Sequence, residues 1–280
     1  MDRELVLAVL VAVLCGGALV AAGWWPARMP IATCGRVLER RAWRRLWLPL
    51  VPAALLFAAL CGWASGEPAA AERVPTALLV GALPFGAVVL RAVWRAGRSA
   101  TSAHAEVAVG TVGLVRPRII ISPRAAMGLD AGALAAAVAH ERAHMRHRDP
   151  LRLWLAQLGS DLCYPWPQAA VRFRCWRQAL ELARDEEARF SGIPGPDLAA
   201  AILASLKFHR AGAPVRAASM VGDATFVKDR IARLMQPLEP AESHGKSAAW
   251  VLGVGLAVVL ALLFGTAFGE RVVRSFLLVA

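Results

Sequence analysis

The sequence has few of the features that a disulfide-stabilised or nucleic-acid-binding protein needs. It contains five cysteines in 280 residues, none in a C-x-x-C pair. The odd number predicts no disulfide framework, and free thiols suit a reducing compartment. The net charge is +12, but no module that combines basic and aromatic residues is present, so we expect no direct nucleic-acid binding. Basic residues next to apolar runs instead favour anionic lipid head groups.

Charged residues are also missing from four long stretches, at about residues 5–25, 46–65, 74–90 and 247–269. A helix of about 20 apolar residues crosses the roughly 30 Å core of a bilayer. The third stretch reaches this length, to residue 94, if Arg91 extends its charge to the interface. We therefore expect four transmembrane helices in a lipid bilayer. The alternatives are that one or two stretches are buried helices of a soluble protein, or that the first is a cleaved signal, although acidic residues near its start argue against a signal.

The distribution of arginine predicts the orientation. Six arginines lie between the first and second stretches: Arg28, Arg36, Arg40, Arg41, Arg44 and Arg45. The positive-inside rule makes this basic loop cytoplasmic. Residues 95–246 are then cytoplasmic, residues 270–280 form a short external tail, and the protein lies in a bacterial-type inner (plasma) membrane. Arg271 and Arg274 in that tail oppose this orientation locally.

The segment His140-Glu141-Arg142-Ala143-His144 has the H-E-x-x-H pattern. It lies in a stretch, 131–148, that is rich in Ala, Leu, Arg and His, for which Asp130 is a plausible N-cap. Imidazoles four residues apart share a helix face and can bind one Zn²⁺, while the intervening glutamate can deprotonate a water. The pattern predicts a zinc metallopeptidase in which His140 and His144 bind the metal and Glu141 is catalytic.

Such a site needs a third protein ligand. Residues 168–190 predict a helix, entered through prolines and closed by Gly192. Glu181 and Asp185 lie on one face of it, so the first can bind the metal while the second accepts a hydrogen bond from an imidazole. The alternative is a solvated acidic face that pairs with nearby arginines.

Two further local features frame these helices. The apolar residues of 106–122, interrupted by glycine and proline, predict a short hairpin or small sheet. Asp149-Pro150 predicts the start of a new helix, with Asp149 as its N-cap. Tyr164, the single tyrosine, lies in a predicted turn where packing explains it as well as catalysis does, and we assign no residue to oxyanion stabilisation.

At these motifs the sequence resembles a known family. The runs Val115–Ser122, Ala137–His144, Arg148-Asp149-Pro150, Glu181–Glu186 and Lys228–Leu234 are similar to the membrane zinc peptidases of the BlaR/MecR type. The resemblance implies a gluzincin with His140, His144 and Glu181 as Zn²⁺ ligands, Glu141 as general base and acid, and Asp185 behind an imidazole. The implied fold is mainly α, with four transmembrane helices (1–94 holding three, 247–269 the fourth) and an α+β peptidase domain, 95–246, inserted between the third and fourth.

The resemblance also implies a protein substrate, for example a transcriptional repressor in a signalling pathway. Only residues 270–280 follow the fourth stretch, so we expect no external penicillin-binding sensor domain, and a separate sensor protein would have to supply that role. Two alternatives stay open. One is a catalytically silent signalling or scaffold protein on a peptidase fold, and the other is a quality-control protease similar to the Ste24/HtpX type.

Overall fold

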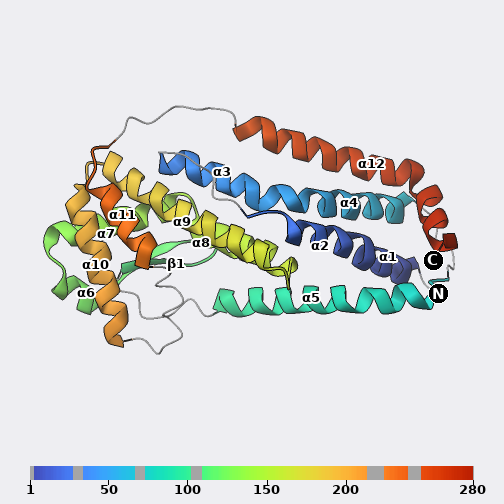
Figure 1. The fold of residues 1–280 in the computed structure, drawn as a ribbon, viewed down its shortest axis with the longest axis horizontal. Helices are drawn as coiled ribbons and strands as arrows, with labels where there is room; N and C mark the ends of the chain where they lie inside the picture. The colour runs from blue at the N-terminus through green and yellow to red at the C-terminus, as the bar shows by residue number, and fades with distance from the viewer. Residues whose placement is uncertain are drawn as a thin grey trace.

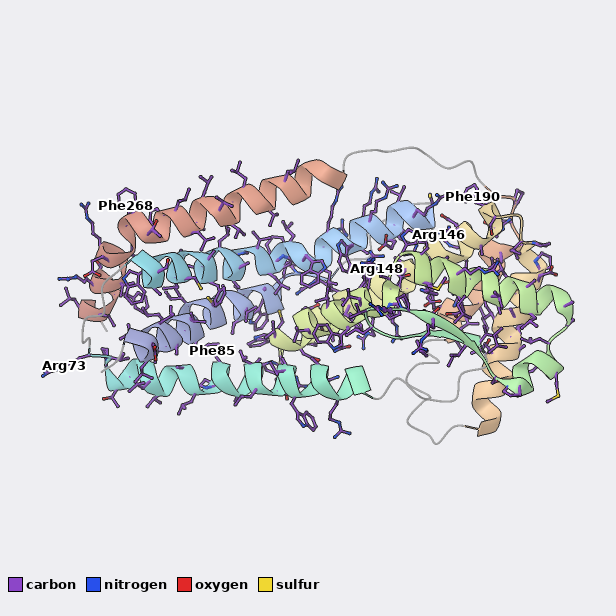
Figure 2. All side chains as sticks on the ribbon, turned by 180° about the vertical axis from the view of Figure 1, so that it is seen from behind. Arg73, Phe85, Arg146, Arg148, Phe190 and Phe268 are labelled. Atoms are coloured by element: carbon purple, nitrogen blue, oxygen red, sulfur yellow. The ribbon has the colours of Figure 1, made fainter. Side chains whose placement is uncertain are left out.

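The computed structural model describes residues 3–27, 34–66, 73–101, 109–212, 224–238 and 247–279. The molecule is elongated and mostly helical, with long apolar helices at one end and a helical domain with one β-hairpin at the other (Figure 1). Both chain termini lie at the end formed by the apolar helices (Figure 1). Arg73 and Phe268 mark that end, while Arg146 and Phe190 mark the opposite one (Figure 2).

Four helices are long and apolar enough to cross a membrane. They span Glu4–Trp24, Gly35–Gly66, Thr76–Arg98 and Leu252–Leu278. In detail they comprise α1 (Arg3–Leu10), a π-helical turn η1 (Val11–Cys15), α2 (Gly16–Trp24), α3 (Gly35–Trp47), a 3₁₀ turn η2 (Leu48–Leu50), α4 (Val51–Gly66), α5 (Thr76–Thr101) and α12 (Ser247–Val279). The four apolar stretches expected from the sequence are therefore confirmed as helices.

Two boundaries differ from the prediction. Helix α5 continues to Thr101 and α12 continues to Val279, so residues 270–279, expected as a short tail after the fourth span, are helical. Phe276 and Leu277 pack with Val6 and Leu10 of α1 in one apolar cluster. Glu270 and Arg274, which follow the apolar run in the sequence, form an ion pair one helical turn apart. Their charges therefore compensate each other within the helix.

From Gly35 on, the residues of the expected basic loop form helix α3. Arg28 lies outside the described residues. Leu38, Ala42 and Leu46 follow one another at intervals of four, and this apolar face is buried against α8 and α9. The arginines occupy the rest of the helix surface. The first part of the second span, α3, thus packs in the same core as α8 and α9.

The other domain elements agree with the sequence more closely. They are β1 (Val109–Val112), β2 (Arg118–Ile121), α6 (Pro123–Gly128), α7 (Ala131–Arg146), α8 (Asp149–Leu162), α9 (Pro167–Phe190), α10 (Gly195–Gly212) and α11 (Ala224–Leu234). The strands pair antiparallel, Val109 opposite Ile121 and Val112 opposite Arg118, which confirms the hairpin; residues 106–108 lie outside the described part. Asp130 caps α7, because its side chain accepts from the backbone N–H of Ala133.

The start of α8 differs from the prediction. Arg148, in the left-handed conformation at φ 52°, precedes the helix, and Asp149 is its first residue rather than its cap. The side chain of Asp149 turns away from the backbone amides of α8 and bonds to His144, Arg184 and Arg152 instead.

Helices α8 and α9 are fixed to the apolar helices by charged residues. Arg172 of α9 donates to the carbonyl oxygens of Ala22 and Trp25, at the end of the first span. Asp161 of α8 pairs with Arg95 of α5 at 3.1 Å. The domain therefore docks directly on the membrane helices, which sets the position of α9 relative to them.

Candidate metal centre

Helix α7 carries the two histidines of the H-E-x-x-H segment on its buried side. Small residues, Ala133, Ala136 and Ala143, let the helix approach its neighbours closely and are all buried. The rings of His140 and His144 meet edge to face, with centroids 4.7 Å apart, and their Nε2 atoms are 3.0 Å apart. Two imidazole nitrogens therefore converge on one point.

Helix α9 brings a carboxylate to the same point. Glu181 Oε2 lies 3.4 Å from His140 Nε2, and its Oε1 lies 3.9 Å from His144 Nε2. Ligands about 2.0–2.1 Å from a tetrahedral zinc ion are about 3.3 Å from one another. The three side chains form a group whose ligand atoms all lie within 4.8 Å of each other. The donor set and its spacing fit a metal ion.

Carboxylates stand behind both rings. His144 Nδ1 lies 2.9 Å from Asp149 Oδ2, and His140 Nδ1 lies 3.0 Å from Asp185 Oδ1, although that ring N–H is not aligned with the oxygen. A carboxylate facing a ring nitrogen keeps the proton on that nitrogen and fixes the ring orientation, as is usual behind metal-binding histidines.

The Nε2 atoms of both histidines and the carboxylate of Glu181 form a cluster of hydrogen-bond acceptors. With both Nδ1 atoms protonated, both Nε2 atoms present lone pairs to each other and to the carboxylate of Glu181. Buried acceptors that face one another repel unless a proton or a cation lies between them. Both histidines are buried, whereas the side chain of Glu181 keeps 28% of its surface exposed. The group therefore favours a cation and is open to solvent on the side of Glu181.

The charges around the group are consistent with this. Burial lowers the pKa of His140, but Asp185 and Glu181 outweigh burial and raise it to about 10. Burial would raise the pKa of Glu181, but Arg230 and the histidines hold it well below its usual range. The single guanidinium of Arg230 faces two carboxylates, Glu181 and Asp185, so the negative charge left over would be neutralised by a proton or by a metal ion.

Arg230 of α11 contacts the two carboxylates of α9, Glu181 and Asp185. Its guanidinium bonds to both oxygens of Asp185 and lies 3.1 Å from Glu181 Oε2. Burial would raise the pKa of Asp185, but the nearby positive charge of Arg230 lowers it. The carboxylates in turn raise the pKa of Arg230. Arg230 therefore holds the two α9 carboxylates in place.

Glu141 lies next to this group on α7 and is held from the hairpin. The Thr111 hydroxyl of β1 is 2.7 Å from Glu141 Oε2 and 3.1 Å from the Glu141 carbonyl oxygen. Val109 packs beside Leu134 and Val138, which fixes β1 on α7. The strand therefore orients the carboxylate of Glu141.

The structure brings together His140, His144, Glu181 and Asp185, the residues that spacing alone put on two helix faces. Sequence reasoning missed Thr111, Asp149, Arg184 and Arg230. A local signal existed for Asp149, because a second imidazole also requires an acceptor and Asp149 follows His144 by five residues. The guanidinium of Arg91 lies over the ring of Tyr164, with its central carbon 3.8 Å from the ring centroid. Tyr164 thus lies where α5 meets the end of α8.

The protein therefore combines four helices that could cross a membrane with a group of side chains that could hold a metal ion. Residues 108–234, which include every side chain of the group, match the model of the BlaR1 peptidase M56 family. The match covers less than half of the chain and supports a BlaR1-type peptidase. No curated protein and no solved structure matches the chain.

Replacing Asp149 by asparagine is expected to weaken metal binding by about 10- to 100-fold, because the charge that orients His144 is lost. The measurement is competition with a chromophoric zinc chelator, using the full chain in detergent. Asp161→Asn is the matched control: it removes a buried charge from the other end of α8 and should leave affinity unchanged. Equal affinities for all three proteins would rule out this role for Asp149.

Proposed function

We propose that the chain is a membrane-embedded, zinc-dependent endopeptidase that cuts a cytoplasmic or membrane-associated protein. The observation that carries the proposal is the convergence of His140, His144 and Glu181 with a carboxylate behind each imidazole. In this proposal these three residues bind Zn²⁺, Glu141 is the catalytic base and acid, and Asp185 and Asp149 orient the imidazoles.

A zinc ion held by this group supplies Lewis acidity, which acidifies water and polarises the scissile carbonyl. Glu141 accepts the proton of the attacking water and passes it to the leaving amine. Thr111 suits both protonation states of Glu141. Its hydroxyl can donate to the carboxylate, or can donate to the backbone carbonyl while accepting from the protonated acid. The side chain of Glu141 thus stays in one orientation through both proton transfers.

The substrate is proposed by class alone. A repressor that acts in a signalling pathway would reach the site from the cytoplasm, with a separate protein sensing the signal. A quality-control role would instead select misfolded membrane proteins. Comparing membrane and cytosolic proteomes of cells that carry the wild type or Glu141→Gln distinguishes these roles by which proteins accumulate.

We place the metal centre on the cytoplasmic side. Five arginines of α3 lie at the end of the membrane helices that carries the centre, and Arg274 at the opposite end is paired with Glu270. An exported phosphatase joined to the C-terminus should therefore be active, and a fluorescent protein that folds only in the cytoplasm should be dark there. The reverse pattern would invert the orientation.

Glu141→Gln should reduce cleavage of casein, or of the substrate found by proteomics, by at least about 100-fold, because the amide cannot accept the proton. Zinc content should match that of the wild type, because Glu141 is not a ligand in this proposal. Unchanged cleavage in the variant would exclude Glu141 as the base. Stoichiometric zinc without cleavage of any substrate by the wild type would favour the scaffold alternative.

Thr111→Val should lower kcat roughly 10-fold, because a hydrogen bond to a charged group contributes about 1.5 kcal/mol. Valine has nearly the same shape and suits a strand, so KM and zinc affinity should not change. Thr111→Ser keeps the hydroxyl and should retain most of the activity. If serine and valine reduced kcat equally, packing rather than the hydroxyl would explain the effect.

A further inference from the structure

Glu39 is a buried carboxylate on a helix whose other buried residues are small or apolar. It lies on α3 and is 7% exposed, among the core residues Leu38, Ala42 and Leu46. It accepts from Arg152 of α8 and from Trp176 Nε1 of α9, the latter at 3.3 Å. A buried charge is costly and needs partners, and here both partners come from the helices that carry the metal centre.

Arg152 links Glu39 to the metal centre. One nitrogen of its guanidinium donates to Glu39, and another donates to Asp149 Oδ1 at 3.0 Å. The guanidinium lies over the rings of Trp43 and Trp176, at 4.6 and 5.6 Å from their centroids. Cation–π contacts on two rings restrict the planar group, so Arg152 is a rigid connection.

Asp149 completes the connection to the metal centre. It is fully buried, and its oxygens are shared among His144, Arg184 and Arg152. Burial would raise the pKa of Asp149, but His144 and Arg184 hold it well below the usual range. Because Asp149 Oδ2 lies 2.9 Å from His144 Nδ1, a shift of the carboxylate toward or away from Arg152 would change the hydrogen bond that orients the imidazole.

We propose that Glu39 is a positioning residue for His144: through Arg152 and Asp149 it sets the orientation in which that imidazole binds metal. The inference deepens the proposed function and rests on it.

The connection begins on a membrane helix. Residues Gly35–Gly66 form one helical span, in which the 3₁₀ turn at Leu48–Leu50 joins α3 to α4, so a displacement of the second span can reach Glu39. A second contact joins the same helix to α9, because Glu186, next to Asp185, accepts from the backbone amides of Gly35 and Arg36. Rotation of α3 by one residue, about 100°, would withdraw Glu39 from Arg152. The metal affinity of the site therefore depends on the position of the second span.

The test is zinc affinity of the full chain in detergent, measured by chelator competition on Glu39→Gln. We expect affinity to fall about 3- to 10-fold, less than the 10- to 100-fold typical of residues that touch a ligating imidazole directly. Glu4→Gln is the control, since it removes an exposed acid at the opposite end of the molecule, and it should bind zinc like the wild type.

A double-mutant cycle separates positioning from general destabilisation. In the Asp149→Asn background, Glu39→Gln should cause no further loss, because its path to His144 is already cut. Additive losses would overturn the proposal. If Glu39→Gln does not fold, Arg152→Lys replaces it, because lysine keeps the charge but cannot bridge two carboxylates in the same geometry; wild-type zinc affinity in that variant would overturn the proposal too.

The outcomes are distinct from those of the proposed function. A wild-type chain that binds no zinc refutes the peptidase proposal itself. A wild-type chain that binds zinc and cleaves, beside a Glu39→Gln variant with the same zinc affinity, refutes the role of Glu39 alone.

Discussion

The structure depends on the way in which two imidazoles are oriented. Carboxylates on the outer nitrogens of His140 and His144 turn the inner nitrogens toward each other and toward Glu181. This arrangement of acceptors is unfavourable in a buried place without a positive charge among them. Four helices supply the parts: α7 the imidazoles, α9 two carboxylates, α8 the carboxylate behind His144, and α11 a guanidinium. The packing of these four helices therefore assembles a group of side chains that could hold a cation.

Helix α9 joins this position to the membrane. Its first half is bound to the end of α2 through Arg172 and packs Trp176 against α3, whereas its second half presents Glu181 and Asp185. One helix thus fixes the distance between the apolar helices and the candidate metal centre. The same contacts bring α3, which the sequence analysis grouped with the membrane region, into one core with α8 and α9.

Features with a local pattern could be predicted from the sequence. Apolar length predicted four membrane helices, and an i, i+4 spacing put His140 with His144 and Glu181 with Asp185. Interactions between distant segments could not be predicted in this way. The many arginines of α3 made its narrow apolar face hard to recognise. Arg230 lies 45 residues from Asp185. Asp149 was predicted to cap its own helix, although it bonds to three other side chains. Charge on α12 indicated an end to the helix, but Glu270 and Arg274 compensate each other.

The buried ion pairs also restrict how the domain can move. Asp149 and Arg184 are almost wholly inaccessible to water, and separating such a pair leaves an uncompensated charge at a cost of about 3–5 kcal/mol. This is a large part of the 5–15 kcal/mol that stabilises a typical domain. Small continuous distortions of the network are therefore unfavourable, and a displaced α3 would leave the pairs intact or break one of them completely. The first pair to separate would be Glu39 with Arg152, because Arg152 is 23% exposed and water can solvate it once it is released.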